Sequence, residues 1–383
     1  MLAVQLIDIQ KRYHDHPVLR SIGLQVRPGE YLVLLGESGC GKTTMLRTIA
    51  GLESPDGGRV QIGDVDVTAV ASRKRDVSML FQRDGLYPHM TLRQTMAFPM
   101  KGLISSVETQ RRIERAAELL GLDAILDRHP EHLSGGELRR AGLAKMVVRE
   151  AAIRLLDEPL SGLDGPIRHQ FQRDLLRWHR EIPGTTIHVT HDGDEAMRMA
   201  DRVAVMHRGQ IVQVATPTNL YHHPCCLAVA KSLGSPPINL HPGQLRRGEL
   251  HVPGSMGRVR FDPAADQHGV IRSGPGEEEP REVHAAIRPE SFMLAEPHGA
   301  DGATASDLVF SVICRSSLVY RGQCHACFET QGQGQGHWRQ GQWLDALLPA
   351  ACGVRPGDTL MVAVKLADLL LFDAAGQRIE RAA

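Results

Sequence analysis

The sequence has no excess of charge of either sign, since Lys and Arg together number 44 and Asp and Glu also number 44. Nothing in this balance favours nucleic acid or an anionic membrane surface, and we expect no nucleic-acid partner. Long apolar runs are also absent: residues 31–35 and 361–364 fall far short of the roughly 20 residues that span a bilayer. Residues 1–5 show no basic region before an apolar core, so we expect no signal peptide and a cytosolic chain.

Cysteine is scarce and scattered, with seven residues in a chain of 383. Without an export signal, this pattern indicates free thiols rather than a disulfide framework. The sequence Cys324-His325-Ala326-Cys327 has the spacing of a metal-binding half-site, but the second half is missing. Free thiols are therefore the favoured interpretation there as well. Cys40 lies two residues before Lys42, which predicts an acidified thiol.

A glycine-rich stretch directly follows the apolar run at residues 31–35: Gly36-Glu37-Ser38-Gly39-Cys40-Gly41-Lys42-Thr43. We interpret this part of the chain as a strand, a loop and a helix that continues from Thr44 and can end at Gly51. Glycines let the loop N–H groups turn toward an anion, and the helix N-terminus adds positive charge. Lys42 can reach the β- and γ-phosphates, and the Thr43 hydroxyl suits Mg²⁺. The stretch predicts a nucleoside triphosphatase.

Three more strand candidates end in polar residues. Residues 153–158 end in Asp157 and Glu158, residues 186–191 end in His191, and Gln82 follows the strand candidate at 77–81. Ligands of open α/β sheets bind at the carboxyl ends of the strands, so these side chains should meet at one edge. Asp157 is the candidate for holding Mg²⁺ through water, and Glu158 can orient the attacking water.

The remaining patterns place two domains along the chain. Alternating residues near 2–8 and 18–26 predict an antiparallel β subdomain beside the nucleotide strand. Helical spacing follows from about residue 92 to 130, and Ser134 is a plausible N-cap of a further helix. We place the first domain at 1–235, with a helical part at about 88–150.

The second domain, 236–383, follows the break at Gly234-Ser235-Pro236-Pro237. It lacks long helical patterns and shows short strand candidates separated by Gly- and Pro-rich turns, at 283–287, 308–314, 343–348 and 359–364. We interpret it as a small β-barrel, with the Gln- and Gly-rich run at 332–341 as a long hairpin loop.

With these residues in place, the chain resembles the ATP-binding subunits of ABC transporters. Residues 133–137, Leu-Ser-Gly-Gly-Glu, match the family signature apart from the last residue, which is usually Gln. Residues 161–164 match its D-loop. Longer runs resemble the bacterial carbohydrate importers of the maltose and glycerol-3-phosphate type, namely 87–91, 190–192, 195–197, 234–239, 287–290 and 371–373.

The resemblance implies a P-loop (ABC) ATPase domain with antiparallel β and helical subdomains, followed by a small all-β OB-like (TOBE) domain with a regulatory role. It implies that Glu158, His191 and Gln82 are catalytic and that Thr43, Gln82 and Asp157 serve the metal, with ATP and Mg²⁺ as ligands. Nucleotide-binding positions carried over from the family are Tyr13, Gly36, Glu37, Ser38, Gly39, Cys40, Gly41, Lys42, Thr43, Thr44, Ser134, Gly135, Gly136, Glu137 and Asp164.

The resemblance also implies partners. Two copies should pair head-to-tail around two ATP molecules, on the cytoplasmic face of the cell membrane. Two permease subunits should hold this pair, and an extracytoplasmic solute-binding protein should deliver the solute. The family thus predicts an ATPase that powers import, with a sugar or polyol derivative as the solute.

Other interpretations stay open from the sequence alone. The solute could be a polyamine, iron or a phosphonate, and the chain could be a mainly regulatory ATP-binding module. A DNA-repair or translation protein of the same family would need a long coiled coil or a second cassette, which this chain lacks. Two departures are notable: Glu137 adds negative charge that Arg139 and Arg140 can offset, and Arg154 lies in a buried strand. We expect Arg154 to reach an edge or to pair with an acid.

Overall fold

The computed structural model describes residues 1–81, 86–246, 248–256, 259–260, 280–295, 307–331 and 342–380. The chain divides into two compact units, Met1–His222 and His223–Ala383. This division precedes the expected boundary at 235/236, because residues just after His222 pack with the second unit. The Arg288 guanidinium donates to the carbonyl oxygens of Ala230 and Leu233, at 3.2 and 2.7 Å.

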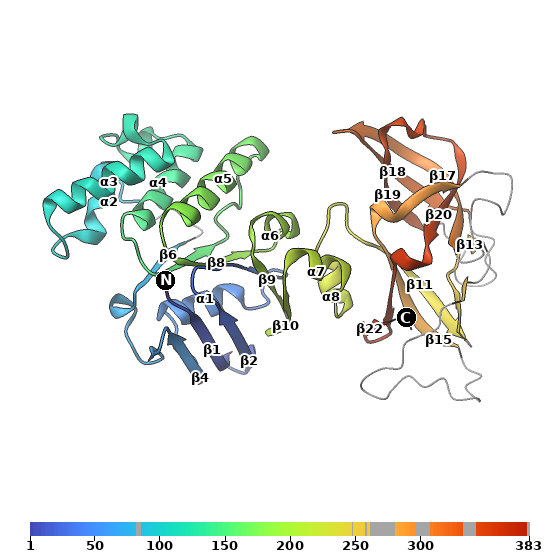
Figure 1. Cartoon of the computed structure of the whole chain (residues 1–383), viewed down its shortest axis with the longest axis horizontal. Coiled ribbons are helices and arrows are strands. Elements are labelled where there is room, and N and C mark those ends of the chain that lie inside the picture. The colour runs from blue at the N-terminus through green and yellow to red at the C-terminus, as the bar shows by residue number, and fades with distance from the viewer. Residues whose placement is uncertain are drawn as a thin grey trace. The chain divides into compact units, whose positions relative to one another are not determined.

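The first unit contains two sheets with helices around them (Figure 1). An antiparallel sheet has the order β2-β1-β4-β5, formed by β1 (Val4–Tyr13), β2 (His16–Val26), β4 (Gly57–Ile62) and β5 (Val65–Asp66). The second sheet has the order β10-β9-β3-β8-β7-β6, formed by β3 (Tyr31–Leu35), β6 (Val77–Leu80), β7 (Ile153–Asp157), β8 (Thr185–Thr190), β9 (Arg202–His207) and β10 (Gln210–Ala215). Its strands are parallel except for β10, which pairs antiparallel with β9. The predicted antiparallel subdomain beside the nucleotide strand is confirmed.

The helices of the first unit are α1 (Lys42–Ala50), α2 (Leu92–Ala97), α3 (Ser106–Leu120), α4 (Gly135–Val147), α5 (Gly165–Glu181), α6 (Gly193–Met199) and α7 (Pro217–His222). Helices α2, α3 and α4 gather at one end of the unit (Figure 1), where the sequence predicts a helical part. Gly51 ends α1 in the left-handed conformation, with φ of 72°, and its N–H bonds the carbonyls of the last turn. The main core lies between the two sheets and α1.

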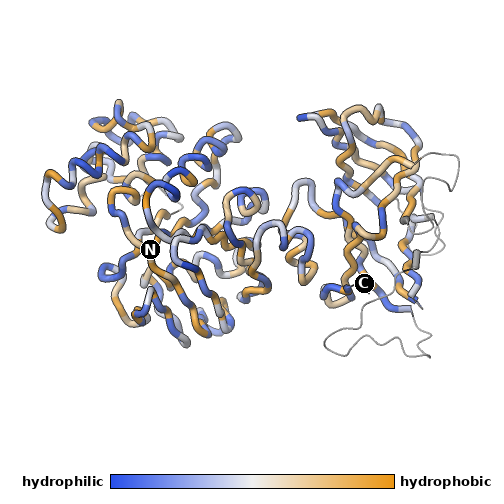
Figure 2. The backbone as a smooth tube through the Cα atoms, viewed as in Figure 1, coloured by the Kyte–Doolittle hydropathy of each residue, from blue (hydrophilic) through white to orange (hydrophobic). Residues whose placement is uncertain are grey.

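The central strands β3, β7 and β8 are buried along their whole length. Residues of β3 are accordingly apolar throughout, and those of β7 and β8 are apolar or β-branched apart from Arg154, Asp157 and His188. Figure 2 shows hydrophobic stretches interrupted by hydrophilic residues in this unit. Because both faces of these strands are covered, polar groups can reach a ligand at the strand ends, and ligands of open α/β sheets bind at the carboxyl ends.

Arg154 in β7 is 1% exposed, and its environment differs from both expectations. Its Nη2 donates to the carbonyl oxygens of Ile182 (2.5 Å) and Pro183 (2.9 Å), just past the end of α5. The guanidinium also lies 4.3 Å from the centre of the Trp178 ring. The charge is thus offset by the negative end of a helix and an aromatic face rather than by an acid. Burial lowers the pKa of Arg154 to about 10.

The described residues of the second unit form α8 (Leu227–Lys231), three single-turn 3-10 helices and strands. The 3-10 turns are Pro289–Ser291, Ala350–Cys352 and Leu366–Asp368. One sheet has the order β14-β12-β11-β15-β21-β22, formed by β11 (Asn239–Arg246), β12 (Glu249–His251), β14 (Val259–Arg260), β15 (Arg281–Ile287), β21 (Leu369–Asp373) and β22 (Arg378–Ile379). The other has the order β16-β20-β17-β18-β19 with β13 beside β17, formed by β13 (Ser255–Met256), β16 (Phe292–Ala295), β17 (Asp307–Tyr320), β18 (Gln323–Thr330), β19 (Trp343–Pro349) and β20 (Thr359–Lys365). One apolar core takes side chains from both sheets. The predicted all-β character and the four predicted strands are confirmed, while the run at 332–341 lies outside the described residues.

Candidate functional site

The phosphate loop, residues 36–43, connects buried β3 to the first turn of α1. Gly39 and Gly41 adopt φ of 81° and 108°, a region that glycine enters without strain. A Cβ on Gly41 would lie 2.9 Å from the carbonyl oxygen of Val18, so a larger residue would displace the loop. Gly41 is therefore required by both conformation and space, and Gly39 by conformation alone.

Lys42 is the first residue of α1, and its ammonium group is held across the phosphate loop. The Nζ atom donates to the carbonyl oxygens of Gly36 at 2.7 Å and Glu37 at 2.9 Å. The side chain is buried, so solvent screens its charge less than it would at the surface. An anion bound within this loop would meet a fixed positive charge.

Thr43 and Asp157, the two described residues that the sequence assigns to a metal, lie in direct contact. The Thr43 hydroxyl donates to Asp157 Oδ1 at 3.0 Å, which connects the start of α1 to the end of β7. Burial raises the pKa of Asp157, and the hydrogen bond from Thr43 opposes this shift. Burial thus disfavours a bare carboxylate here, and a nearby cation would offset that cost. Two hard oxygen donors fit Mg²⁺.

Glu158 and His191 lie at the ends of neighbouring strands. Residue Glu158 has φ of 47°, uncommon for a non-glycine residue, and its N–H donates to the Val189 carbonyl oxygen at 3.0 Å. This conformation turns the chain sharply after Asp157. His191 Nδ1 lies 3.4 Å from Glu158 Oε1. Strained residues concentrate at functional sites, and here the strain accompanies an acid beside a histidine.

The signature segment, residues 133–137, contains the N-terminus of α4. As predicted, Ser134 is the N-cap, and it forms a capping box with Glu137. Glu137 Oε2 accepts both the Ser134 N–H and the Ser134 hydroxyl, each at 2.7 Å. The hydrogen bond from the Ser134 side chain, followed by that from its N–H, lowers the pKa of Glu137. Arg140 adds a smaller favourable charge, whereas Arg139 donates to the Ser161 carbonyl oxygen at 3.1 Å.

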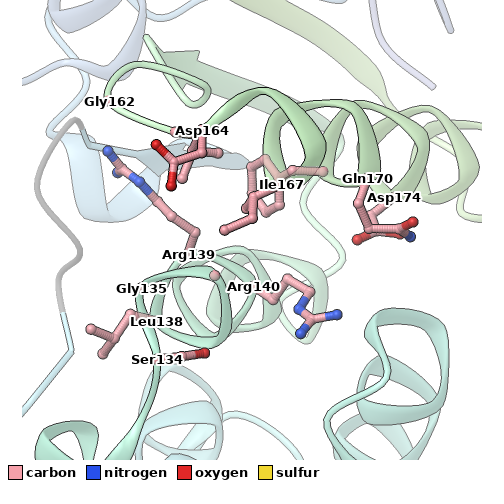
Figure 3. Close-up of a pocket in the computed structure, with 13 residues that line it drawn as sticks. Ser134, Gly135, Leu138, Arg139, Arg140, Gly162, Asp164, Ile167, Gln170 and Asp174 are labelled. Carbon is pink, nitrogen blue, oxygen red and sulfur yellow. The ribbon is translucent and has the colours of Figure 1, made fainter.

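A cavity of about 580 Å³ lies between α4 and α5 (Figure 3). Ser134, Gly135 and Gly136 line it from α4, and Asp164 lines it from the N-cap of α5. No residue of the phosphate loop is among its lining residues. The predicted nucleotide-binding residues therefore form two separate groups within one chain.

Tyr13 and Gln82 stay predicted positions. Tyr13 ends β1 at a hairpin and is 40% exposed, with Lys11 Nζ 5.5 Å from the centre of its ring. This exposure leaves a ring face for stacking, which stays a prediction. Gln82 lies outside the described residues.

The pKa of Cys40 differs from the expectation of an acidified thiol. Burial is the main influence on Cys40 and raises its pKa, so the predicted acidified thiol is wrong. The nearby Lys42 acts in the expected direction but has the smaller effect. Burial also raises the pKa of Cys324 to about 11. Among the described residues, no group of three or more His, Cys, Asp or Glu side chains is arranged to hold a metal ion.

Two residues near His191 received no role from the sequence. Glu195, in α6, is buried. Arg168, in α5, donates to the Leu163 carbonyl oxygen at 3.2 Å, and its Nη1 lies 3.5 Å from Asp192 Oδ2. An acid on the buried side of a short amphipathic helix is the signal that could have identified Glu195. Nothing in the spacing of Arg168 identifies its partners.

The fold and the phosphate loop together define a P-loop nucleotide-binding protein, and comparison with known proteins narrows the class. Residues 19–161 match the family model described as ABC transporter. The sn-glycerol-3-phosphate import ATP-binding protein UgpC 3 of Agrobacterium fabrum is 36% identical over 381 residues, covering 99% of this chain and 100% of that protein. The trehalose import ATP-binding protein SugC of Mycobacterium tuberculosis is 35% identical, covering 98% and 97%.

A solved dimeric structure of MJ0796, a bacterial ABC transporter cassette, superposes with a TM-score of 0.51 and 25% identity. The superposition covers 56% of this chain and 98% of the MJ0796 chain. The chain belongs to the ATP-binding proteins of ABC importers, and it is an ATPase coupled to transport. Across the described residues, no helix has the length and apolar character needed to cross a membrane.

Proposed function

We propose that this chain powers the import of a sugar or polyol derivative. The names of its relatives support this solute class: they include import proteins for sn-glycerol-3-phosphate and trehalose and a lactose transport protein. The solute itself is not expected to touch this subunit. Uptake assays with labelled glycerol-3-phosphate, trehalose and lactose in a deletion strain test the class, and loss of polyamine uptake instead would contradict it.

The observation that carries the proposed chemistry is the convergence of three strand ends. Lys42 follows β3, Asp157 and Glu158 end β7, and His191 follows β8. Lys42 would offset charge on the transferred phosphate. Glu158 would orient or deprotonate the attacking water, and His191, 3.4 Å from it, would contact the same phosphate.

We assign Mg²⁺ to Thr43 and Asp157, where it would offset charge on the β- and γ-phosphates. The 3.0 Å contact between the two oxygens supports the pairing, as does the burial of the carboxylate. Gln82 stays a predicted third contributor.

We propose that the active form is a head-to-tail homodimer. Ser134, Gly136 and Asp164 share a cavity that the phosphate loop does not line, so one chain supplies only half of the nucleotide contacts. In a head-to-tail pair, the helix N-terminus at Ser134 would face the γ-phosphate held by the other copy. ATP would then close the pair, and hydrolysis would reopen it.

The wider assembly follows from membership of an importer family. We propose that the homodimer lies on the cytoplasmic face of the cell membrane, docked through its helical part, about 88–150, onto two permease subunits. An extracytoplasmic protein would deliver the solute. We assign residues 1–235 to the ATPase domain and 236–383 to an OB-like regulatory domain.

The decisive experiment replaces Glu158 with Gln. ATP should still bind, because the phosphate loop is unchanged, while kcat should fall about 10²- to 10⁴-fold, since the general base is lost. Equilibrium binding of radiolabelled ATP and phosphate release by the assembled transporter measure the two effects. Glu181→Gln, an exposed change in α5, is the matched control. Hydrolysis that survives in Glu158→Gln would remove Glu158 from this role.

A further inference from the structure

Buried polar groups of β8 and α6 are hydrogen-bonded next to the turn that carries His191. The Thr190 hydroxyl donates to Glu195 Oε2 at 2.6 Å and accepts the Asp192 N–H at 3.0 Å. Thr190 is 3% exposed and Glu195 is 5% exposed. One hydroxyl thus connects the residue after His191 to a buried acid in α6.

A second buried pair, on β8 and the strand that leads into the phosphate loop, lies beside the same acid without a hydrogen bond to it. Glu195 Oε2 lies 3.8 Å from His188 Nε2, and His188 Nδ1 lies 3.0 Å from the Tyr31 hydroxyl. Burial lowers the pKa of His188 to about 3, so this imidazole is neutral. His188 and Thr190 point to one face of β8 because alternate residues of a strand share a face. Two separate hydrogen bonds thus tie β8 to its neighbours: Thr190 bonds Glu195 in α6, and His188 bonds Tyr31 in β3.

A second connection reaches the same turn from its outer side. Arg168 Nη1 lies 3.5 Å from Asp192 Oδ2, and Arg168 Nη2 donates to the Leu163 carbonyl oxygen at 3.2 Å. These side chains are about a third exposed, at 36% and 31%. Exposed ion pairs contribute about 0–1 kcal/mol, so the inner network should dominate.

Stability alone does not explain a buried acid at this place. Burial of a carboxylate costs several kcal/mol before its hydrogen bonds are counted, and an apolar pair of similar volume is often as stable. Glu195 does orient the hydroxyl: because it accepts the hydrogen bond from Thr190, a lone pair of the Thr190 oxygen faces the Asp192 N–H. This arrangement fixes the backbone on both sides of His191.

We propose that Glu195 is a positioning residue for His191 and acts through the Thr190 hydroxyl. The inference rests on the proposed function, which gives His191 its contact with phosphate. A displacement of about 1 Å can lower a rate by up to about 10²-fold, so loss of the network should reduce kcat and leave ATP binding at the phosphate loop intact.

The test compares variants that keep or remove the hydrogen bond. Thr190→Ser and Glu195→Gln retain a hydroxyl donor and an oxygen acceptor, and their kcat should stay within about threefold of wild type. The double variant Thr190→Val/Glu195→Leu replaces the hydroxyl and the carboxylate together by apolar groups, so neither is left buried without the other. The Asp192 N–H loses its acceptor, but it lies at a part-buried turn that water can reach. The kcat of this double variant should fall about ten- to a hundredfold at unchanged ATP affinity and an unchanged or raised melting temperature. Arg168→Gln is the control for the outer connection, with a change below about threefold.

A spectroscopic readout separates this inference from the proposed function. In histidine-labelled full-length protein, the His191 Cε1 signal should be alike in wild type and Thr190→Ser, and shifted or broadened in the double variant. A double variant with wild-type kcat and an unchanged His191 signal would overturn the inference. A parallel loss of ATP affinity and kcat would overturn it too. Absence of ATP hydrolysis by the wild-type transporter would instead contradict the proposed function, and the His191 signal would still decide on positioning.

Discussion

The two halves of the proposed nucleotide site are held by the chain in different ways. The phosphate loop lies between a fully buried strand and α1, and Thr43 contacts Asp157 from another strand. The signature segment lies at the exposed N-terminus of α4. There Ser134 and Glu137, three residues apart, form the hydrogen bonds of a capping box with each other. One half depends on contacts between distant parts of the sequence and the other on local spacing. The first should therefore be sensitive to packing and the second to single polar contacts.

The largest effect should come from mixing two inactive variants. Lys42→Ala removes the loop cation, and Gly136→Asp puts a negative charge on the other half. A Cβ on Gly136 meets only Ile167, at 3.5 Å or more, so Asp fits. Each homodimer should lose about 10²-fold or more in turnover. In a one-to-one mixture, half of the dimers carry one intact site of two, so about a quarter of wild-type turnover should return.

The matched control for this mixture combines Lys42→Ala with Glu158→Gln. Both changes lie on the same half of the site, so each dimer keeps a defect in both sites and turnover should stay low. Phosphate release measured after co-expression and purification of tagged pairs gives both results. Equal turnover in the two mixtures would contradict a site shared between copies.

A smaller effect is expected from Ser134→Ala. Loss of an N-cap side chain costs about 1 kcal/mol, and the first turn of α4 should fray. Hydrogen exchange of the amides at Glu137 and Leu138 should become about fivefold faster, while ATP binding to the phosphate loop stays unchanged. Ser134→Asn retains a capping oxygen and is the control. Weakened ATP binding by the isolated Ser134→Ala chain would show that the two halves are coupled within one copy.

The smallest effect concerns the pH dependence of the same cap. Hydrogen bonds from Ser134 lower the pKa of Glu137 in the folded chain. Its contribution to stability is therefore present above the ordinary glutamate pKa and is lost as the pH falls through the lowered folded pKa. Circular dichroism melts between pH 7 and pH 3 should show a slightly shallower loss of stability for Glu137→Gln than for wild type. Identical pH profiles would contradict a stabilising role of the Glu137 charge.

Much of the fold could be predicted because its signals are local. The strand before Gly36, the helix that Gly51 ends and the Ser134 cap each depend on residues within a few positions of one another. The environments of Arg154 and Cys40 could not be predicted in the same way. The Arg154 guanidinium donates to carbonyl oxygens just past the end of α5, and burial affects the pKa of Cys40 more than the nearby Lys42 does.

The sequence by itself determined the phosphate loop, the acids after a buried strand, and membership of a transporter ATPase family. Each of these depends on a short pattern of residues whose backbone and charge requirements are specific. Only the tertiary structure decided which of these residues meet. The parallel pairing of β7 with β8 brings Glu158 to His191, and burial of α6 against β3 and β8 places Glu195 on Thr190. Such contacts join residues that are distant in sequence or lie on different elements, and no local pattern encodes them.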